Sequence, residues 1–380
     1  MAPAEAAPMR ILLLTTGLRL GGAEQQVAAL AQRFVALGHA VAIVSLTPDC
    51  EVSLPAAAQV LRLDMRKTPW SMAAALWRVR GFVREWRPDV MHAHMVHANL
   101  FARVLTRFGG MPPLVCTAHS YDEGGAARML AYRLTDRWCR LTTHVGEQGR
   151  QRMIALRAVH AARIAVVPNG IDTARFRPDP TTRDAARAAL GVGADTPLIL
   201  NVGRLVPEKA QGLLLRAFAG LPTGHGARLL IAGEGPQRTE LVQRIAQLGL
   251  QQQATLLGAR NDIAALLNAA DLFVLSSDIE GMPIALGEAL ACGCPVVATD
   301  APGVVELIGD RTGVVPRADA DALSAAMATA LADGRGDAAA QAARHQRIAS
   351  RLSLEAVARQ WLDCYGRLAD TATTARVETA

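Results

Sequence analysis

The sequence predicts an α/β protein of two domains, each built on a doubly wound parallel sheet. Its 380 residues exceed what a single hydrophobic core usually holds. Short apolar runs alternate with helix-period segments along the chain, and this alternation favours parallel sheets with helices on both faces. The turn Pro168-Asn169-Gly170 separates two such series. We therefore expect one domain over residues 1–170, a second over residues 171–370 and a loose tail over residues 371–380.

Composition narrows the class of protein. Hydrophobic residues make up 51% of the chain and charged residues 19%, as in a globular protein. No apolar run reaches the roughly 18 residues that a membrane span needs, and the run over residues 11–16 is too short for a signal-peptide core. We expect a cytoplasmic protein. The six cysteines show no CxxC or Cys/His spacing, so we expect reduced core thiols and no metal site.

Charge is distributed unevenly along the chain. The first 170 residues carry 20 Lys and Arg against 11 Asp and Glu, and the remainder carries 20 against 23. A basic first half favours an anionic partner, either a membrane or a nucleic acid. No nucleic-acid-binding module is recognisable, so we expect no nucleic acid partner.

A basic segment over residues 70–86 makes the membrane the favoured anionic partner. It carries Trp70, Trp77 and Trp86 among several arginines, as helices at a membrane interface do. Our hypothesis is peripheral attachment to the cytoplasmic face of the inner membrane. A solvated helix with core tryptophans is the alternative.

The first domain is predicted from its apolar runs and helical periods in chain order. We expect strands over residues 10–16, 41–46, 60–63, 90–94, 114–118 and 141–145, with helices over residues 23–37, 70–86 and 128–140. The first strand leads into Gly21 and Gly22, either a phosphate-type loop or simply a tight turn. The dinucleotide pattern GxGxxG is missing. His92, His94 and His97 lie at the end of a predicted strand, where ligands usually bind, and are interpreted as acceptor-side groups or as structural histidines.

The second domain is predicted in the same way. Residues 173–196 should form a linker with a short helix. We expect strands over residues 198–202, 228–232, 255–257, 272–275 and 295–298, with helices at 209–218, 239–248, 263–270, 283–291, 321–331, 338–350 and 354–368. Lys209 falls in the predicted first turn of a helix, where the helix dipole disfavours a cation. An anion shared with Arg204 would offset that cost, whereas plain surface charge is the alternative.

The segment 278–300 gives the strongest indication of a ligand-binding site. Pro283 suits the start of a helix and Gly293 its end, and small or apolar residues surround that helix. Glu288 is the one charge between Gly281 and Thr299. A buried carboxylate needs a partner, so backbone amides or the hydroxyl groups of a ligand, such as those of ribose, must satisfy it.

These residues resemble a known family. Glu280-Gly281-Met282-Pro283, with Glu288 completing an E-x7-E spacing, resembles the signature of retaining GT-B glycosyltransferases, most closely glycosyltransferase family 4. The resemblance implies two Rossmann-like domains facing an interdomain cleft, with the helix over residues 354–368 returning to the first domain. Gly203-Arg204 and Lys209 resemble the family's diphosphate motif, although Ala210 replaces its usual glycine.

The resemblance also implies roles for individual residues. In the family the second glutamate binds ribose and the first contacts the donor sugar, while a histidine at the position of His119 lies beside that sugar. The catalytic candidates are His119, Arg204, Lys209 and Glu280. The candidates for nucleotide-sugar binding are Gly21, Gly22, Gly203, Arg204, Lys209, Gly233, Gly235, Arg260, Glu280, Gly281, Met282, Pro283, Ile284, Ala285 and Glu288.

The expected function is a retaining transfer of a sugar from a UDP- or GDP-sugar to a saccharide or lipid-linked acceptor. We expect this hexosyltransferase activity to serve cell-surface polysaccharide or glycolipid biosynthesis without a metal or other cofactor. A nucleotide-sugar 2-epimerase of similar fold and a non-catalytic sugar-nucleotide-binding subunit are the alternatives.

Overall fold

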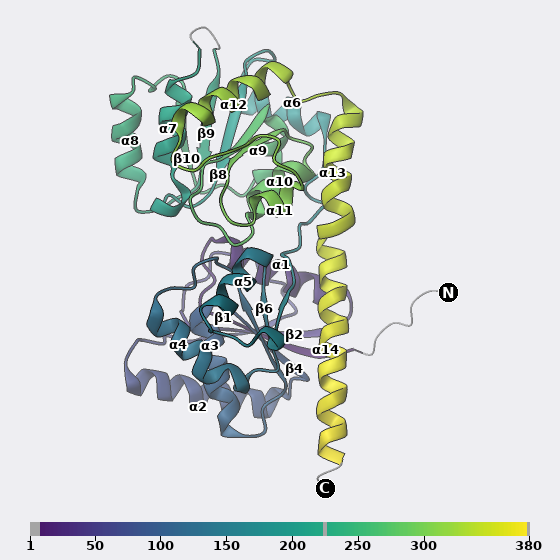
Figure 1. The fold of residues 1–380 in the computed structure, drawn as a ribbon. Coiled ribbons are helices and arrows are strands. Elements are labelled where there is room, and N and C mark those ends of the chain that lie inside the picture. The colour runs from purple at the N-terminus through teal and green to yellow at the C-terminus, as the bar shows by residue number, and fades with distance from the viewer. Residues whose placement is uncertain (1–7, 223–225, 378–380) are drawn as a thin grey trace. The chain divides into compact units, whose positions relative to one another are not determined.

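Two compact units make up the structure, a computed structural model that describes residues 8–222 and 226–377. The first unit takes residues 1–170 together with 354–380, and the second takes residues 171–353 (Figure 1). All strand pairs within the two sheets are parallel. The prediction of two parallel-sheet α/β domains is confirmed.

The first unit is built on seven strands in the order β3-β2-β1-β4-β5-β6-β7. Its elements in chain order are β1 (Arg10–Thr15), α1 (Gly22–Ala36), β2 (Ala40–Ser45), β3 (Gln59–Arg62), α2 (Pro69–Trp86), β4 (Val90–His94), α3 (Val96–Leu105), η1 (Thr106–Phe108), β5 (Leu114–Ala118), α4 (Ala126–Thr135), η2 (Asp136–Trp138), β6 (Leu141–His144), α5 (Glu147–Ala155), η3 (Ala161–Arg163), β7 (Ile164–Val166) and α14 (Leu354–Val377). Every one of these strands except β7 was predicted from the sequence, whereas helices α3 and α5 were not.

Two apolar clusters cover the two faces of this sheet. One cluster packs α2 and α3 against the strands, and the other packs α1 and α14 against the opposite face. The side chains of Trp361 and Tyr365 in α14 are almost fully buried there. Helix α14 continues to Val377, so the expected loose tail from residue 371 is wrong as far as Val377, and residues 378–380 lie outside the described part.

The second unit is built on six strands in the order β10-β9-β8-β11-β12-β13. Its elements are α6 (Pro180–Ala189), β8 (Leu198–Val202), η4 (Pro207–Lys209), α7 (Gln211–Ala219), β9 (Arg228–Ala232), α8 (Arg238–Gln247), β10 (Ala254–Gly258), α9 (Ile263–Ala269), β11 (Leu272–Leu275), α10 (Ile284–Ala291), β12 (Val296–Thr299), α11 (Val304–Ile308), β13 (Val314–Val315), α12 (Ala320–Asp333) and α13 (Ala338–Leu352). The short elements η4, α11 and β13 were not predicted from the sequence.

Strand order marks one position in each sheet for ligand binding. In the second unit the chain winds outward from β8 in one direction and then returns to β11 on its other side. In the first unit the same reversal lies between β1 and β4. Ligands of open α/β sheets bind at the carboxyl ends of the strands next to such a reversal.

Candidate functional site

The carboxyl edge of the second sheet brings the predicted residues together. Arg204 and Lys209 follow β8, and Glu280 follows β11, which pairs directly with β8. Lys209 and Glu280 are 71 residues apart in the sequence, yet Lys209 Nζ donates a hydrogen bond to Glu280 Oε1 at 2.6 Å. The motif residues of two separate loops thus meet at the reversal point of the sheet.

The pair of Lys209 and Glu280 was not foreseen from the sequence. The Glu280 side chain is 7% exposed and the Lys209 side chain 23%, so the ion pair is shielded from most of the solvent. The amide of Asp278 donates to Glu208 O at 2.9 Å, and Ser276 Oγ donates to Lys209 O at 2.9 Å. Backbone hydrogen bonds therefore hold the two loops in the register that the ion pair needs.

The local structure around Lys209 corrects one expectation. Lys209 ends the 3-10 turn η4, and α7 begins only at Gln211. Between them Ala210 is left-handed, with φ 47° and ψ 39°. Lys209 therefore lies outside the first turn of α7, and the helix-dipole argument used for it does not apply. The family's usual glycine at this position would adopt the left-handed conformation without strain.

The strain at Ala210 can be tested by substitution. Ala210→Gly is expected to raise the free energy of unfolding by about 0.5–1 kcal/mol, because a left-handed alanine costs more than the added flexibility of glycine. Chemical denaturation measures this difference. Ala219→Gly, at the exposed end of α7, is the matched control and is expected to lower stability by about 0.5–1 kcal/mol. A loss of stability in both variants would contradict a strained Ala210.

Arg204 is the uncommitted cation of this site. Its side chain is exposed, and within residues 8–222 and 226–377 nothing pairs with its guanidinium. Its backbone is fixed, since Gln211 Nε2 donates to Arg204 O at 2.9 Å. Because its backbone is held and its guanidinium is unpaired, Arg204 is available to bind an anionic ligand.

Close packing of two loops requires glycine at Gly233 and Gly235, whereas a Cβ at Gly203 would meet only ordinary contacts of 3.7 Å or more. A Cβ at Gly233 would overlap Gly203 O, and one at Gly235 would overlap Leu205 O. Gly233 also has φ 148°, which side chains rarely adopt. These glycines let the loop after β9 support the loop that carries Arg204. Arg260 lies beyond β10 and is already bound by Asp262 through two hydrogen bonds of 2.5 and 2.8 Å.

Helix α10 is less enclosed than its sequence suggested. It begins at Ile284 with Pro283 at the N-cap, one residue later than expected. Its residues 286, 287 and 289–291 are buried, but Ile284, Ala285 and Glu288 form a partly exposed stripe. The stripe starts at the helix N-terminus, where amide groups lack intrahelical acceptors. Glu288 therefore lies on the partly exposed side of α10, one turn along from Ile284 and Ala285 at its N-terminus.

Glu288 is a carboxylate without a hydrogen-bond donor. No backbone or side-chain group in the described part of the chain donates to it. Burial raises its pKa to about 8, with Arg175 opposing and Asp172 adding to the rise. The reading in which backbone amides satisfy this group is thus wrong for the described structure, and the carboxylate remains available to ligand hydroxyls.

The predicted residues of the first unit follow β1 and β5. Gly21 caps α1 in an extended conformation, and the absence of a Cβ makes room for the carboxylate of Glu24 in the first turn. A phosphate at this helix start would meet that carboxylate, so the loop of Gly21 and Gly22 is better suited to neutral sugar hydroxyls.

His119 lies at the end of β5 in a cluster of neutral imidazoles. Its Nε2 is 3.0 Å from Nδ1 of His94, and Glu123 accepts from the His119 amide at 3.1 Å. The pKa of His119 is lowered to about 3 by burial and by His144. The Nδ1 of His119 is buried without a partner in the described structure. His119 can therefore offer one ring nitrogen to a neutral ligand group.

His92 and His94 are structural rather than exposed acceptor-side groups. His92 bonds Tyr365 Oη at 2.5 Å and Thr117 Oγ1 at 2.6 Å, and both histidines are at most 1% exposed. The covering residue Tyr365 comes from α14. Glu123, which holds the amides of His119 and Ser120, was also missed because nothing in its sequence neighbourhood distinguishes it.

The buried histidines predict a stability that falls on acidification. Burial lowers the pKa of His92, His94, His119 and His144, so the folded chain binds fewer protons than the unfolded chain below pH 6.5. We expect His119 alone to remove about 1–2 kcal/mol between pH 6.5 and 5. Denaturation across this range measures the slope, and His119→Gln should make it shallower. An unchanged slope would contradict a buried neutral His119.

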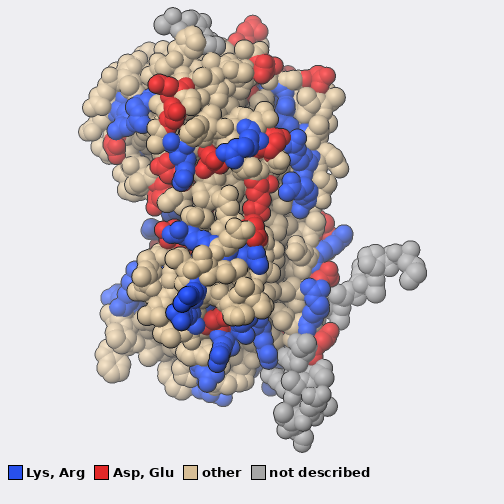
Figure 2. Space-filling view, viewed as in Figure 1, with Lys and Arg blue, Asp and Glu red and all other residues tan. Residues whose placement is uncertain are grey.

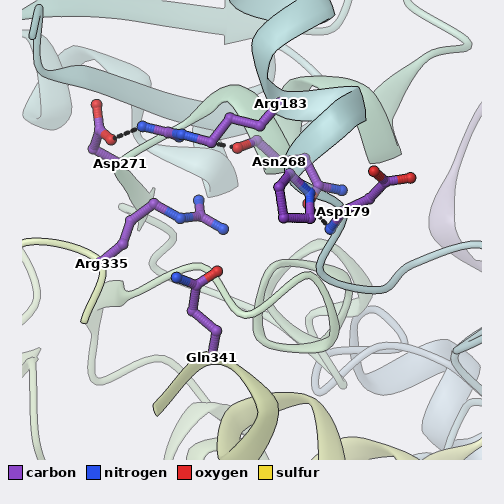
Figure 3. Close-up of a pocket in the computed structure, with 7 residues that line it drawn as sticks. Asp179, Arg183, Asn268, Asp271, Arg335 and Gln341 are labelled. Atoms are coloured by element: carbon purple, nitrogen blue, oxygen red, sulfur yellow. Dashed lines mark hydrogen bonds and ion pairs between the residues drawn. The ribbon is translucent and has the colours of Figure 1, made fainter. Parts of the chain in front are cut away.

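A cavity of about 400 Å³ in the second unit is not this site (Figure 3). It lies at the amino edge of the sheet, where Asp271 precedes β11. Arg183 donates to Asp271 at 2.5 Å and to Ala269 O at 2.7 Å. Arg335 donates to Leu267 O and Ala270 O. Both arginines thus bind backbone carbonyls at the end of α9, which gives them a structural role there.

Comparison with known proteins identifies the family of the chain. The family model Glycosyltransferase Family 4 matches residues 20–175, and the model Glycosyl transferases group 1 matches residues 182–347. The chain is 33% identical over 270 residues to D-inositol 3-phosphate glycosyltransferase of Mycobacterium tuberculosis, covering 66% of this chain and 55% of that protein. It is 29% identical over 248 residues to EpsF of Bacillus subtilis, covering 63% and 64%. The matched region thus spans less than two thirds of either relative.

A solved structure supports the fold over nearly the whole chain. Anabaena HepE, crystallised with UDP and glucose, has a TM-score of 0.80 at 21% identity and covers 94% of this chain and 100% of its own. At this identity the likeness establishes the fold. With its two matching family models, its GT-B fold and its motif residues gathered at one sheet edge, the chain belongs to glycosyltransferase family 4.

Proposed function

We propose that the chain transfers a sugar from a nucleotide diphosphate sugar to a saccharide or lipid-linked acceptor, with retention of configuration. The observation that carries the proposal is the convergence of Arg204, Lys209 and Glu280 at the sheet reversal, with the unsatisfied Glu288 on α10. HepE was solved with UDP and with UDP-glucose, which supports a nucleotide-sugar donor here. A role in cell-surface polysaccharide or glycolipid synthesis is part of the same proposal.

The charges suit the departure of a diphosphate. As the sugar-phosphate bond breaks, negative charge grows on the leaving diphosphate, and preorganised cations lower the barrier. Arg204 is free to supply a two-pronged contact, and Lys209 adds a compact charge. We propose that these two side chains stand where a metal ion acts in other transferases.

The remaining groups suit the nucleoside and the sugar. Glu288 would accept hydrogen bonds from the two ribose hydroxyls, and the amides at the start of α10 would bind sugar or phosphate oxygens. Glu280 would orient the sugar while Lys209 holds its carboxylate. His119 would offer a neutral ring nitrogen to a substrate hydroxyl.

Retention is proposed without a covalent sugar-enzyme intermediate. A retaining glycosidase places two carboxylates about 5 Å apart across the bond, one of them as a nucleophile. Glu280 is held by Lys209 and so is a poor nucleophile. We therefore favour attack on the face that the diphosphate leaves, with the leaving group guiding the acceptor. Analysis of the product by NMR tests the retention itself, because an inverted anomeric centre would contradict it.

The lysine content of the chain permits a direct test of the donor site. Lys67 and Lys209 are the two lysines of the sequence. Reductive methylation with carbon-13 therefore labels these two amines and the terminal amine. Adding UDP, GDP, ADP or their sugars is expected to shift the Lys209 resonance and leave that of Lys67 unchanged. If no nucleotide moves the Lys209 signal, the proposed donor site is wrong.

Peripheral membrane contact of the first unit is a separate part of the proposal. No helix in the described ranges combines the length and apolarity needed to cross a bilayer. On α2, Trp70 is 86% exposed and Trp77 is 61% exposed, whereas Trp86 is buried. In the view of Figure 2, basic atoms predominate over the first unit, while both signs mix over the second. Exposed tryptophans beside basic residues favour a membrane interface.

The membrane contact predicts a lipid-dependent sedimentation. The chain is expected to sediment with vesicles that contain anionic lipid at low salt, and Trp70→Ala with Trp77→Ala should lower the bound fraction at least threefold, because two interfacial anchors are lost. Val242→Ala, at another exposed apolar position, is the control. If the unmodified chain does not bind anionic vesicles even at low salt, the proposed membrane contact is wrong.

A further inference from the structure

A second groove lies in the first unit, at the edge opposite to His119. It has a volume of about 600 Å³ and is lined by residues of η1 and η2 and by those leading into β5. The lining residue Leu114 begins β5, so the groove lies at the amino ends of the strands. His119 follows the carboxyl end of β5. The groove is thus distinct from every candidate position for sugar transfer.

Four arginines line this groove. Arg107, Arg137, Arg140 and Arg163 contribute to its wall, and the lining contains no Asp or Glu. The nearby Asp136 is buried, and its Oδ2 lies 3.2 Å from Nε of Arg163. One of the four cations is therefore neutralised and three remain.

None of the three remaining arginines forms an ion pair with a carboxylate in the described residues. Arg137 and Arg140 are exposed, and in the described ranges neither pairs with a carboxylate or donates to a carbonyl. Helix C-termini favour nearby cations, which accounts for an arginine near the ends of η1 and η2. This effect does not explain Arg137 and Arg140, because their guanidinium groups donate to no carbonyl in the described residues and line the same groove.

Aromatic side chains border the same groove. Arg107 lies over the ring of Trp138 at 5.6 Å. The next residue, Phe108, is 6.0 Å from Trp77, and Arg80 lies over both of these rings at 5.9 and 5.2 Å. Phe108 is 37% exposed and Trp77 is 61% exposed. Trp138 thus lines the cationic hollow, and an exposed aromatic group begins at Phe108, the residue after the lining Arg107.

We propose that this groove binds a phosphate monoester or diphosphate through Arg107, Arg137 and Arg140. Guanidinium groups match phosphate oxygens in paired hydrogen bonds, and three positive charges suit a group with a charge of about −2. The phosphate comes either from a lipid headgroup, with its chain along Phe108 and Trp77, or from a soluble phosphate ester. The groove is separate from the proposed donor site, and its assay needs no sugar transfer.

Calorimetry with inorganic pyrophosphate tests the groove. The titration uses Arg204→Ala with Lys209→Ala, which removes the proposed diphosphate contacts of the second unit and leaves the groove intact. One saturable site is expected. Adding Arg137→Gln and Arg140→Gln should weaken it at least tenfold, because both paired contacts are lost. Arg216→Gln with Arg351→Gln, two exposed arginines of the second unit, removes the same charge and should leave binding unchanged.

A second arm separates the two sources of phosphate. Vesicles of phosphatidylcholine with phosphatidic acid are compared with vesicles of phosphatidylcholine and phosphatidylserine at equal charge. A preference for phosphatidic acid that disappears with Arg137→Gln and Arg140→Gln identifies the lipid headgroup. Pyrophosphate binding without that preference identifies a soluble ester. Equal pyrophosphate affinity in the groove variant and the charge-matched control, or no binding at all, overturns the proposal, whatever the donor-site variants do to transfer.

Discussion

Lys209→Ala is expected to lower the rate of sugar transfer by about 10²–10³-fold. The lysine would supply a fixed positive charge to the departing diphosphate, and loss of one such preorganised group typically costs this much. A nucleoside diphosphate should also bind more weakly, whereas a nucleoside without phosphate should bind as before. Steady-state kinetics and titration with both ligands measure the difference. Lys67→Ala removes the other lysine of the chain and is the control.

The same substitution should destabilise the second unit. It leaves Glu280, which is 7% exposed, without the cation 2.6 Å away. Breaking a buried ion pair from one side costs about 3–5 kcal/mol, and partial exposure of Lys209 lowers our expectation to about 1–3 kcal/mol. Glu280→Gln in the Lys209→Ala background should restore most of the stability but not the transfer rate. If both recover together, Lys209 acts only through folding.

The choice of lysine at position 209 itself carries information. The chain uses arginine at 38 of its 40 basic positions, so lysine is exceptional in this sequence. An ammonium is a compact charge on a flexible stem, whereas a guanidinium is a planar fork. Between Glu280 and a diphosphate, the smaller group can serve both anions. Lys209→Arg is therefore expected to keep the fold and still lose much of the activity.

The sequence predicted the strands and the motif loops well because both depend on local patterns. Apolar runs located β4, β5, β8 and β11 at or close to their observed bounds. Glycines marked the loops whose close packing needs them, as at Gly233. These features are readable because each residue's role is decided by its immediate neighbours in the chain.

What the sequence could not show are contacts between distant segments. The pairing of Lys209 with Glu280 and the covering of His92 by Tyr365 join residues 71 and 273 positions apart. The expected burial of α10 was also too complete, since which side of an apolar helix stays open depends on the elements packed around it. That open side carries Glu288, and its chemistry leads to the second large prediction.

The affinity for a nucleoside should rise with pH until about pH 8. In the ligand-free chain burial raises the pKa of Glu288 to about 8, so its carboxyl group is mainly protonated at pH 7. Two ribose hydroxyls donate best to the ionised form, so binding must release the proton. Affinity should therefore increase by up to about tenfold per pH unit below 8. Titration of uridine or guanosine followed by NMR measures this without the ionisation of a phosphate.

Glu288→Gln separates this binding effect from stability. The amide cannot ionise, so nucleoside affinity should be weak and independent of pH. Folded Glu288 has a raised pKa, which means that the unfolded chain loses this proton first and stability falls as the pH rises from 4.5 to 8. We therefore expect Glu288→Gln to be more stable than the unmodified chain at pH 8. The expected difference is about 1–3 kcal/mol, a range kept small because the Glu288 side chain is partly exposed. The ionised Glu288 carboxylate lowers the stability of the free chain, and binding of a nucleoside offsets this loss through the ribose hydroxyls. If Glu288→Gln bound the nucleoside as tightly as the unmodified chain does, Glu288 would not be the ribose-binding residue.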